Sequence, residues 1–130
     1  TSEIGRSGTV TALKDGMKKA TTEMLVLFLL KHKPMYAYEM MQEMNRLTAG
    51  ALQFNTLYLA IYRLQEHGHI CEAKKETVNN RVRVYFAPTP AGLAYLQQLV
   101  AAYREMTTAI DGMLAQDGQL YREEEPHDQP

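Results

Sequence analysis

The period of the hydrophobic pattern changes along the chain, and the order of these changes constrains the fold more than any other feature. Three segments with helical spacing come first, two short alternating segments follow, and one long segment with helical spacing comes last. Spacings of three and four residues are typical of amphipathic helices, whereas alternation is typical of strands. The pattern predicts a mainly α protein with a small β-hairpin.

The first helix is expected to begin near Gly16, with Asp15 as its N-cap. The apolar run 24–30 could alternatively be a buried strand, but the helical periodicity begins a full turn before it and favours a helix. Residues 1–14 are polar, and we interpret them as a flexible N-terminal arm. The helix should end at Lys33, because the residue before a proline disfavours helical backbone.

Two further helices are expected before the strands. The second covers residues 36–47, and a break at 48–51 follows it. The third is expected to have Asn55 as its N-cap and to end near His67, where a glycine follows. Its inner face should consist of four apolar residues, Leu57, Ala60, Ile61 and Leu64.

The strand-like segments are residues 69–75 and 82–87, with a hairpin turn at 77–81 between them. Two asparagines occupy the middle of this turn, and asparagine tolerates the left-handed backbone that tight hairpins need. Residues 15–88 should therefore form three helices and a hairpin.

The last helix is expected to start at Pro90, because Thr89 is a good cap and proline is favoured at the first helical position. It should occupy the segment 89–116 and extend for about 40 Å. Its apolar residues alternate at spacings of four and three, which is the pattern of a coiled-coil seam. A second copy of the chain is the simplest cover for so long a stripe, which predicts a dimerisation helix; the alternative is a helix packed on its own domain. The stripe consists of Leu96, Leu99, Tyr103, Met106, Ile110 and Met113.

Three helices followed by a hairpin is the element order of a winged helix-turn-helix. In that fold one helix enters the major groove of DNA, where its side chains meet base edges, and the hairpin, or wing, reaches the flanking backbone. We expect the third helix, the wing and the start of the second helix to contact DNA. The predicted residues are Tyr36, Tyr38, Asn55, Thr56, Tyr58, Leu59, Tyr62, Arg63, Lys74, Lys75, Asn79, Asn80, Arg81 and Arg83.

These residues have different expected roles. Arg63 and Tyr62 would read or flank bases, while Asn55, Thr56 and Tyr58 would place the start of the helix on phosphate. The basic wing residues would hold the flanking backbone. We expect the rings of Tyr36 and Tyr38 to pack in the core. Their hydroxyl groups either make no contact with DNA or contact its phosphate backbone.

The charges are divided unevenly between the two parts of the chain, which has 130 residues and a net charge of −1. Residues 1–90 carry 12 Lys and Arg against 8 Asp and Glu, a balance of +4, and residues 91–130 carry 2 against 7, a balance of −5. This fits DNA contact confined to the first part, although a solvated surface has the same balance. The acidic tail 117–130 is predicted to be disordered.

Several short motifs occur in a fixed order over residues 16–114. They include Pro34-Met35-Tyr36-Ala37-Tyr38-Glu39-Met40, Asn55-Thr56-Leu57-Tyr58, and Thr89-Pro90-Ala91-Gly92. Together they resemble the PadR-type regulators. The chain departs from the usual pattern of that family at Ala37, Asn55 and Leu59. Leu59 lies on the expected DNA face, so the family's operator preferences are not transferred.

The resemblance implies a cytoplasmic prokaryotic regulator, usually a repressor, that dimerises through its C-terminal helix and binds a palindromic operator in double-stranded DNA. Many family members release DNA when a small phenolic or drug-like ligand binds. An effector pocket between the two C-terminal helices would involve Tyr95, Tyr103 or Met106. The eight methionines fit either an adaptable pocket or ordinary core packing.

Other classes of function find little support in the sequence. His67, His69 and Cys71 suggest a metal site, but no second cluster supplies further ligands, so we expect neither a metal nor another cofactor. A single cysteine fits a reducing compartment, and a redox role for it stays open. Motifs of catalytic sites are not found, so we expect no enzyme. The longest apolar run has seven residues, far short of the roughly 20 that span a membrane.

Two hypotheses follow. The first is a ligand-responsive dimeric repressor. The second is a winged-helix protein-interaction module that has lost DNA binding, which the apolar Leu59, the weak net charge and the sparsely charged wing favour.

Overall fold

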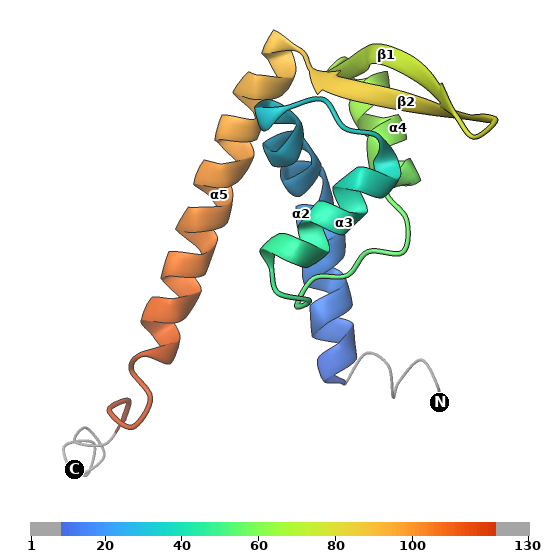
Figure 1. Ribbon diagram of the computed structural model, residues 1–130. Coiled ribbons are helices and arrows are strands. Elements are labelled where there is room, and N and C mark those ends of the chain that lie inside the picture. Colours follow the sequence, from blue (N-terminus) through green and yellow to red (C-terminus); the bar gives the residue numbers. More distant parts are fainter. Residues whose placement is uncertain (1–8, 122–130) are drawn as a thin grey trace, which may run out of the picture. The chain divides into compact units, whose positions relative to one another are not determined.

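The computed structural model describes residues 9–121 (Figure 1). The elements are α2 (Val10–His32), α3 (Ala37–Leu47), α4 (Tyr58–Glu66), β1 (Ile70–Val78), β2 (Arg81–Pro88) and α5 (Pro90–Leu114). This order confirms the predicted mainly α fold, a winged helix with a long C-terminal helix. The described chain divides into two units, one ending at Gln97 and one beginning at Gln98.

Helix α2 begins earlier than predicted. Thr9 is its N-cap, and the Thr9 hydroxyl oxygen accepts a hydrogen bond of 3.2 Å from the backbone N–H of Ala12. Asp15 lies inside the helix and does not cap it. Residues 10–14 are therefore helical, and the prediction of a flexible arm is wrong for them, because a threonine cap supplies the partner that a first-turn N–H group needs. Residues 1–8 lie outside the described part.

The first unit is built around α2, which contacts α3, α4 and β2. Its second half is helical with four buried residues, so the alternative of a buried strand at 24–30 is excluded. The predicted inner face of α4 is confirmed, since all four of its residues are buried. The core contains Val26, Leu27, Leu29, Leu30, Met35, Met40, Met44, Leu57, Ala60, Ile61, Leu64, Ile70, Phe86 and Leu96.

Helix α4 has its N-cap two residues later than predicted, at Leu57 instead of Asn55. Leu57 is only 1% exposed, and its carbonyl accepts the first helical hydrogen bond, 2.9 Å long, from the N–H of Ile61. Burial of this leucine fixes where the helix begins, and it prevails over the capping preference of asparagine. Asn55 and Thr56 lie in the preceding loop, where the Thr56 hydroxyl accepts a bond from the N–H of Tyr58.

The wing is an antiparallel hairpin whose pairing runs from Ile70 opposite Pro88 to Val78 opposite Arg81. Its tip is a two-residue turn in which Asn79 has a φ of 52° and Asn80 a φ of 63°. Two positive φ values in succession define the turn type that matches the twist of the flanking strands. The asparagine turn is confirmed, and it is tighter than predicted, because the residues on either side of it belong to the strands.

A third segment joins the wing at its base. The N–H and carbonyl groups of Met35 exchange hydrogen bonds with those of Phe86, at 3.4 and 3.0 Å. This bridge fixes the chain just before α3 against β2, and no feature of the sequence indicated it. It places the first residues of α3 beside the wing, where the candidate site lies.

The start of α5 agrees with the prediction. The hydroxyl oxygen of Thr89 accepts a hydrogen bond of 3.0 Å from the N–H of Gly92, and the same hydroxyl donates to the carbonyl of Gly68. Gly92 lies directly against the backbone of His69: a Cβ atom at this position would lie 1.9 Å from the His69 carbonyl oxygen. The ring of His69 also stacks on Tyr95, with centroids 4.3 Å apart.

The predicted dimerisation stripe requires one correction. Leu96 is 4% exposed and belongs to the core of the first unit, so it is not available to a second chain. Leu99 is half-buried. The remaining stripe residues are exposed by 42% to 68%; they are Tyr103, Met106, Ile110 and Met113.

The segment after α5 contains hydrogen-bonded turns. The N–H groups of Asp117 and Gln119 donate to the carbonyls of Leu114 and Gln116. Local hydrogen bonding therefore continues beyond the helix, and the prediction of a disordered tail is wrong for residues 117–121. Residues 122–130 of that predicted tail lie outside the described chain.

Candidate nucleic-acid interface

The outer face of α4 carries the side chains that the sequence predicted. Its inner residues are buried, which leaves Tyr58, Leu59 and Tyr62 exposed by 69%, 58% and 58%. Arg63 is also exposed. The hydroxyl of Tyr62 donates to the Glu66 carboxylate at 3.3 Å. This face combines large apolar surfaces with one cation that is free to reach a partner.

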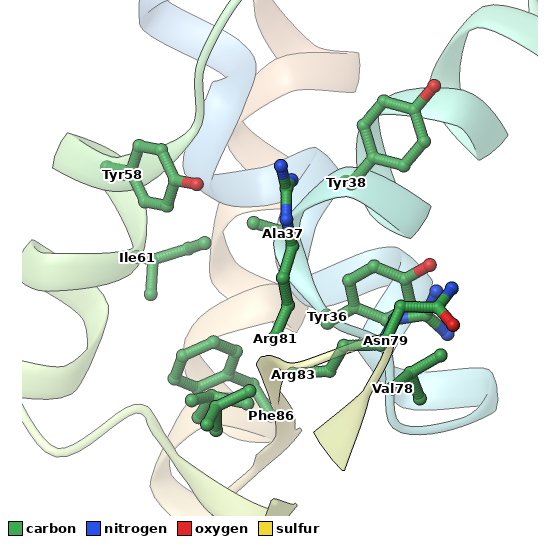
Figure 2. Close-up of a pocket in the computed structure, with 12 residues that line it drawn as sticks. Tyr36, Ala37, Tyr38, Tyr58, Ile61, Val78, Asn79, Arg81, Arg83 and Phe86 are labelled. Carbon is green, nitrogen blue, oxygen red and sulfur yellow. The ribbon is translucent and has the colours of Figure 1, made fainter. Parts of the chain in front are cut away.

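A cavity of about 570 Å³ lies between the start of α3, α4 and the wing (Figure 2). It brings together six of the predicted DNA-contacting residues from three separate elements, and apolar side chains form part of its wall. The lining consists of Tyr36, Ala37, Tyr38, Tyr58, Ile61, Val78, Asn79, Arg81, Val82, Arg83, Val84 and Phe86.

Two arginines supply the positive charge of this cavity. Among the residues that the structure describes, no carboxylate lies within ion-pair distance of Arg81 or Arg83. Figure 2 shows the Arg81 guanidinium reaching between Tyr58 and Tyr38. Guanidinium groups bind phosphate oxygens through two parallel hydrogen bonds, and tyrosine hydroxyls also donate to phosphate. The arrangement is therefore suited to an anion with several oxygens.

Two tyrosine rings and two cations, in contact one after another, join the wing to α3. The Arg83 guanidinium lies 4.7 Å from the centroid of the Tyr36 ring, and Tyr36 meets Tyr85 edge-on, with centroids 5.3 Å apart. The Lys74 ammonium lies 4.6 Å from the centroid of the Tyr85 ring. The Tyr85 hydroxyl is held by Glu76 at 3.1 Å. We call Arg83, Tyr36, Tyr85 and Lys74 the cation–aromatic row.

Tyr85 is the member of this row that sequence reasoning left out of the site. Alternation along β2 places residues 81, 83 and 85 on one face of the strand, which is the available signal. The signal is incomplete, because the contact with Tyr36 depends on the bridge at Met35. Tyr85 thus helps to position Arg83 without lining the cavity itself.

Other predicted wing residues stand apart from the cavity. The Lys74 and Lys75 ammonium groups are paired with Glu76 and Glu72, at 3.6 and 3.8 Å. These carboxylates offset the charges of the two lysines, whereas the charges of Arg81 and Arg83 remain uncompensated. Asn80 is exposed at the tip.

Two cations near α3 are also compensated. Lys33 pairs with Glu39 at 2.8 Å, and the hydrogen bond that the ammonium group donates to this carboxylate raises the pKa of Lys33. Arg46 pairs with Glu43 at 2.6 Å. The hydrogen bond between them raises the pKa of Arg46 and lowers that of Glu43. Both pairs are exposed to solvent, so they contribute little to stability.

A smaller groove of about 250 Å³ follows the line between α2 and α4. Arg63 and Leu59 line it from α4, and Thr56 lines it from the preceding loop. Lys19 of α2 lines the same groove. Glu23 of α2 also lines it, so the groove contains two cations and one carboxylate.

The histidines and the cysteine that suggested a metal site lie outside the lining of the cavity. The described residues contain no group of three or more His, Cys, Asp or Glu that could hold a metal. The ring of His67 stacks on His69, with centroids 6.1 Å apart, and Cys71 is a free, exposed thiol. None of the helices within residues 9–121 has the length and apolar character needed to cross a membrane.

Comparison with known proteins identifies the family. The model of the transcriptional regulator PadR-like family matches residues 26–98. An uncharacterized protein of Lysinibacillus sphaericus is 32% identical over 89 residues, which cover 67% of this chain and 82% of that protein.

Solved structures show the same fold. A transcriptional regulator from Clostridium thermocellum has a TM-score of 0.69 at 23% identity and covers 75% of this chain and 96% of its own. A PadR family transcriptional regulator from Eggerthella lenta has a TM-score of 0.68 at 24% identity, with 81% and 91% covered. With a family model that matches more than half of its length, this chain belongs to the PadR-like family of transcriptional regulators.

Proposed function

We propose that this protein regulates transcription by binding DNA as a homodimer, and that it is a repressor released from a palindromic operator by a small hydrophobic or aromatic effector. The observation that carries the proposal is the cavity between α3, α4 and the wing. It gathers two uncompensated arginines and three tyrosines from elements that a winged helix turns toward DNA.

The roles of the residues follow from their positions. Helix α4 enters the major groove, where Arg63 and Tyr62 meet base edges. Asn55, Thr56 and Tyr58 lie at the start of this helix, close to the sugar-phosphate backbone. Arg81, Arg83, Tyr36 and Tyr38 hold phosphates beside the groove, and the tip residues Asn79 and Asn80 reach the flanking duplex.

Dimerisation is supported by the exposed apolar stripe of α5. Tyr103, Met106, Ile110 and Met113 recur at spacings of three and four residues, and each is at least 42% exposed. A second copy of the same helix can cover such a stripe by coiled-coil packing. The two recognition helices of the dimer would then meet half-sites roughly 34–36 Å apart on one face of a palindromic operator.

The effector is proposed to bind between the C-terminal helices of the two copies. Tyr103 and Met106 are exposed on α5, and Tyr95 lies near the start of the same helix. Aromatic and thioether side chains adapt to flat apolar ligands. Dimer formation would thus complete a pocket to which each chain contributes these residues.

The test is fluorescence anisotropy of labelled duplexes at two salt concentrations. One duplex carries the promoter upstream of the protein's own gene, and the other has a random sequence of the same length. We expect the promoter to bind at least about 10³-fold more tightly, with an affinity that falls steeply as salt rises. Flat anisotropy on both duplexes at low salt would exclude DNA binding.

The second candidate function is a protein-interaction module. The outer face of α4 favours it, because Tyr58, Leu59 and Tyr62 expose large apolar surfaces. Saturable binding to a protein partner, together with no salt-dependent binding to duplex DNA, would support this function over the first.

A further inference from the structure

Leu59 is the least expected residue on the outer face of α4. It is 58% exposed, and its side chain can neither donate nor accept a hydrogen bond. It projects from the helix that we propose to enter the major groove, where base edges consist mainly of hydrogen-bonding groups. The one apolar group on those edges is the C5-methyl group of thymine.

From this chemistry we infer that Leu59 contacts a thymine methyl group, so that the protein selects operators with thymine at a fixed position of each half-site. The inference rests on the proposed DNA binding and adds to it the chemical identity of one base. A leucine packed against any other base edge would displace the water that binds the donors or acceptors of that edge. It would offer no hydrogen bond in return, which is unfavourable. Only against a methyl group does burial of Leu59 favour binding.

The neighbours of Leu59 indicate DNA as the partner of this face. Arg63 lies four residues later on the same side of α4, and Lys19 of α2 lines the same groove. Neither cation has a carboxylate within ion-pair distance in the part of the chain that the structure describes. Glu23 of α2 lines the groove as well, so the groove holds two cations and one carboxylate. An apolar side chain beside this excess of positive charge complements a surface that carries both methyl groups and negative charge, as the major groove does.

The spacing of the two side chains constrains the base sequence. Residues four apart on a helix have Cβ atoms about 5–6 Å apart, and base pairs follow each other at about 3.4 Å. The guanidinium of Arg63 is suited to the O6 and N7 atoms of guanine. The expected half-site therefore has a thymine within about two base pairs of a guanine.

The experiment removes the methyl group alone. High-affinity duplexes are selected with the full-length protein from a random pool, and each thymine of the half-site is then replaced by deoxyuridine in both halves. We expect one position at which the wild-type protein loses affinity by about fourfold for each methyl group. Leu59→Ala should bind the thymine and uracil duplexes with equal affinity.

Leu47 provides the matched control. It is 55% exposed at the end of α3, so Leu47→Ala removes the same atoms from a similarly exposed site outside the interface. This variant should distinguish thymine from uracil as the wild type does. Circular dichroism checks that both variants fold.

Two results would overturn the inference, and they differ from each other. Equal binding of thymine and uracil duplexes by the wild type at every position would refute it and leave DNA binding intact. Absence of salt-dependent binding to any duplex would refute the proposed function together with it, and would direct attention to a protein partner for α4.

Discussion

At the scale of single residues, Tyr36 can contribute to DNA binding in two ways, through its ring or through its hydroxyl group. Its ring lies under the Arg83 guanidinium and against Tyr85, which makes the ring a support and leaves the hydroxyl as a candidate phosphate donor. If the ring matters most, Tyr36→Phe should keep the DNA affinity within about twofold. Tyr36→Leu should lose about two- to fivefold, which corresponds to an exposed cation–π contact.

The salt dependence of binding distinguishes support from direct phosphate binding. Removal of one phosphate-binding cation lowers the slope of log affinity against log salt by about 0.9. Arg83→Ala should show this reduction and weaken binding to all sequences alike, whereas Tyr36→Leu should keep the wild-type slope. A loss of affinity in Tyr36→Phe at an unchanged slope would show that the hydroxyl itself binds phosphate, because an uncharged donor releases no counterions.

Gly92 and Gly112 lie in the same helix, and we expect their replacement by alanine to have opposite effects on stability. A Cβ atom at Gly92 would collide with the His69 backbone at 1.9 Å, whereas nothing lies within 4 Å of one at Gly112. Gly92→Ala should lower the free energy of unfolding by about 1–3 kcal/mol, as overpacking does. Gly112→Ala should raise it by about 0.5–1 kcal/mol through helix propensity.

Thermal unfolding monitored by circular dichroism checks this pair. Equal increases in the melting temperature of both variants would mean that α5 does not pack closely on the segment around His69.

At the scale of elements, the sequence predicted the number and order of helices and strands because each has a strong hydrophobic period. The boundaries at the start of α2 and α4 were less predictable. Val10 and Leu13 continue the helical spacing of α2 but stay exposed, so they resemble a polar arm interrupted by single apolar residues. At α4, burial of Leu57 decided the boundary, and burial depends on tertiary contacts.

The candidate site was predicted residue by residue but not as an arrangement. Exposed positions on α4 follow from its helical period, Arg83 follows from the alternation of β2, and Arg81 was predicted as part of the hairpin turn. The cation–aromatic row could not be predicted, because it depends on the bridge between Met35 and Phe86 and on the register of the wing. The ion pairs of Lys74 and Lys75 likewise depend on which side chains the register brings together.

The wing turn allows a test at this scale. Asn80 has a φ of 63°, which glycine adopts without strain and a β-branched residue adopts at a cost of about 1–2 kcal/mol. Asn80→Gly should therefore preserve or increase the melting temperature, and Asn80→Val should lower it. Faster hydrogen exchange of the wing amides in Asn80→Val would locate the effect, while equal exchange in both variants would contradict the assigned turn.

At the scale of the whole molecule, the proposed dimer depends on the exposed stripe of α5. Ile110 is 50% exposed, and a carboxylate there would be buried without a partner if the stripe forms the interface. Ile110→Glu should sediment as a single chain in analytical ultracentrifugation. Thr108→Glu, which adds the same charge to the same helix outside the stripe, should remain dimeric. A dimeric Ile110→Glu would place the interface elsewhere.

The whole-molecule charge also bears on function. The net charge of −1 gives no general attraction for DNA, so binding must depend on a local arrangement of cations. The structure offers that arrangement in the two arginines of the cavity, whereas several other cations are paired with carboxylates.

The most direct test of DNA binding through this cavity is the salt dependence of duplex affinity for Arg81→Ala, measured by fluorescence anisotropy beside Arg46→Ala. Arg46 is exposed and already paired with Glu43, so it serves as the control for removal of one positive charge. We predict that Arg81→Ala lowers the slope of log affinity against log salt by about 0.9 for each phosphate that Arg81 neutralises, while Arg46→Ala keeps the wild-type slope. Equal slopes for both variants and the wild type would contradict the assignment of the cavity to phosphate.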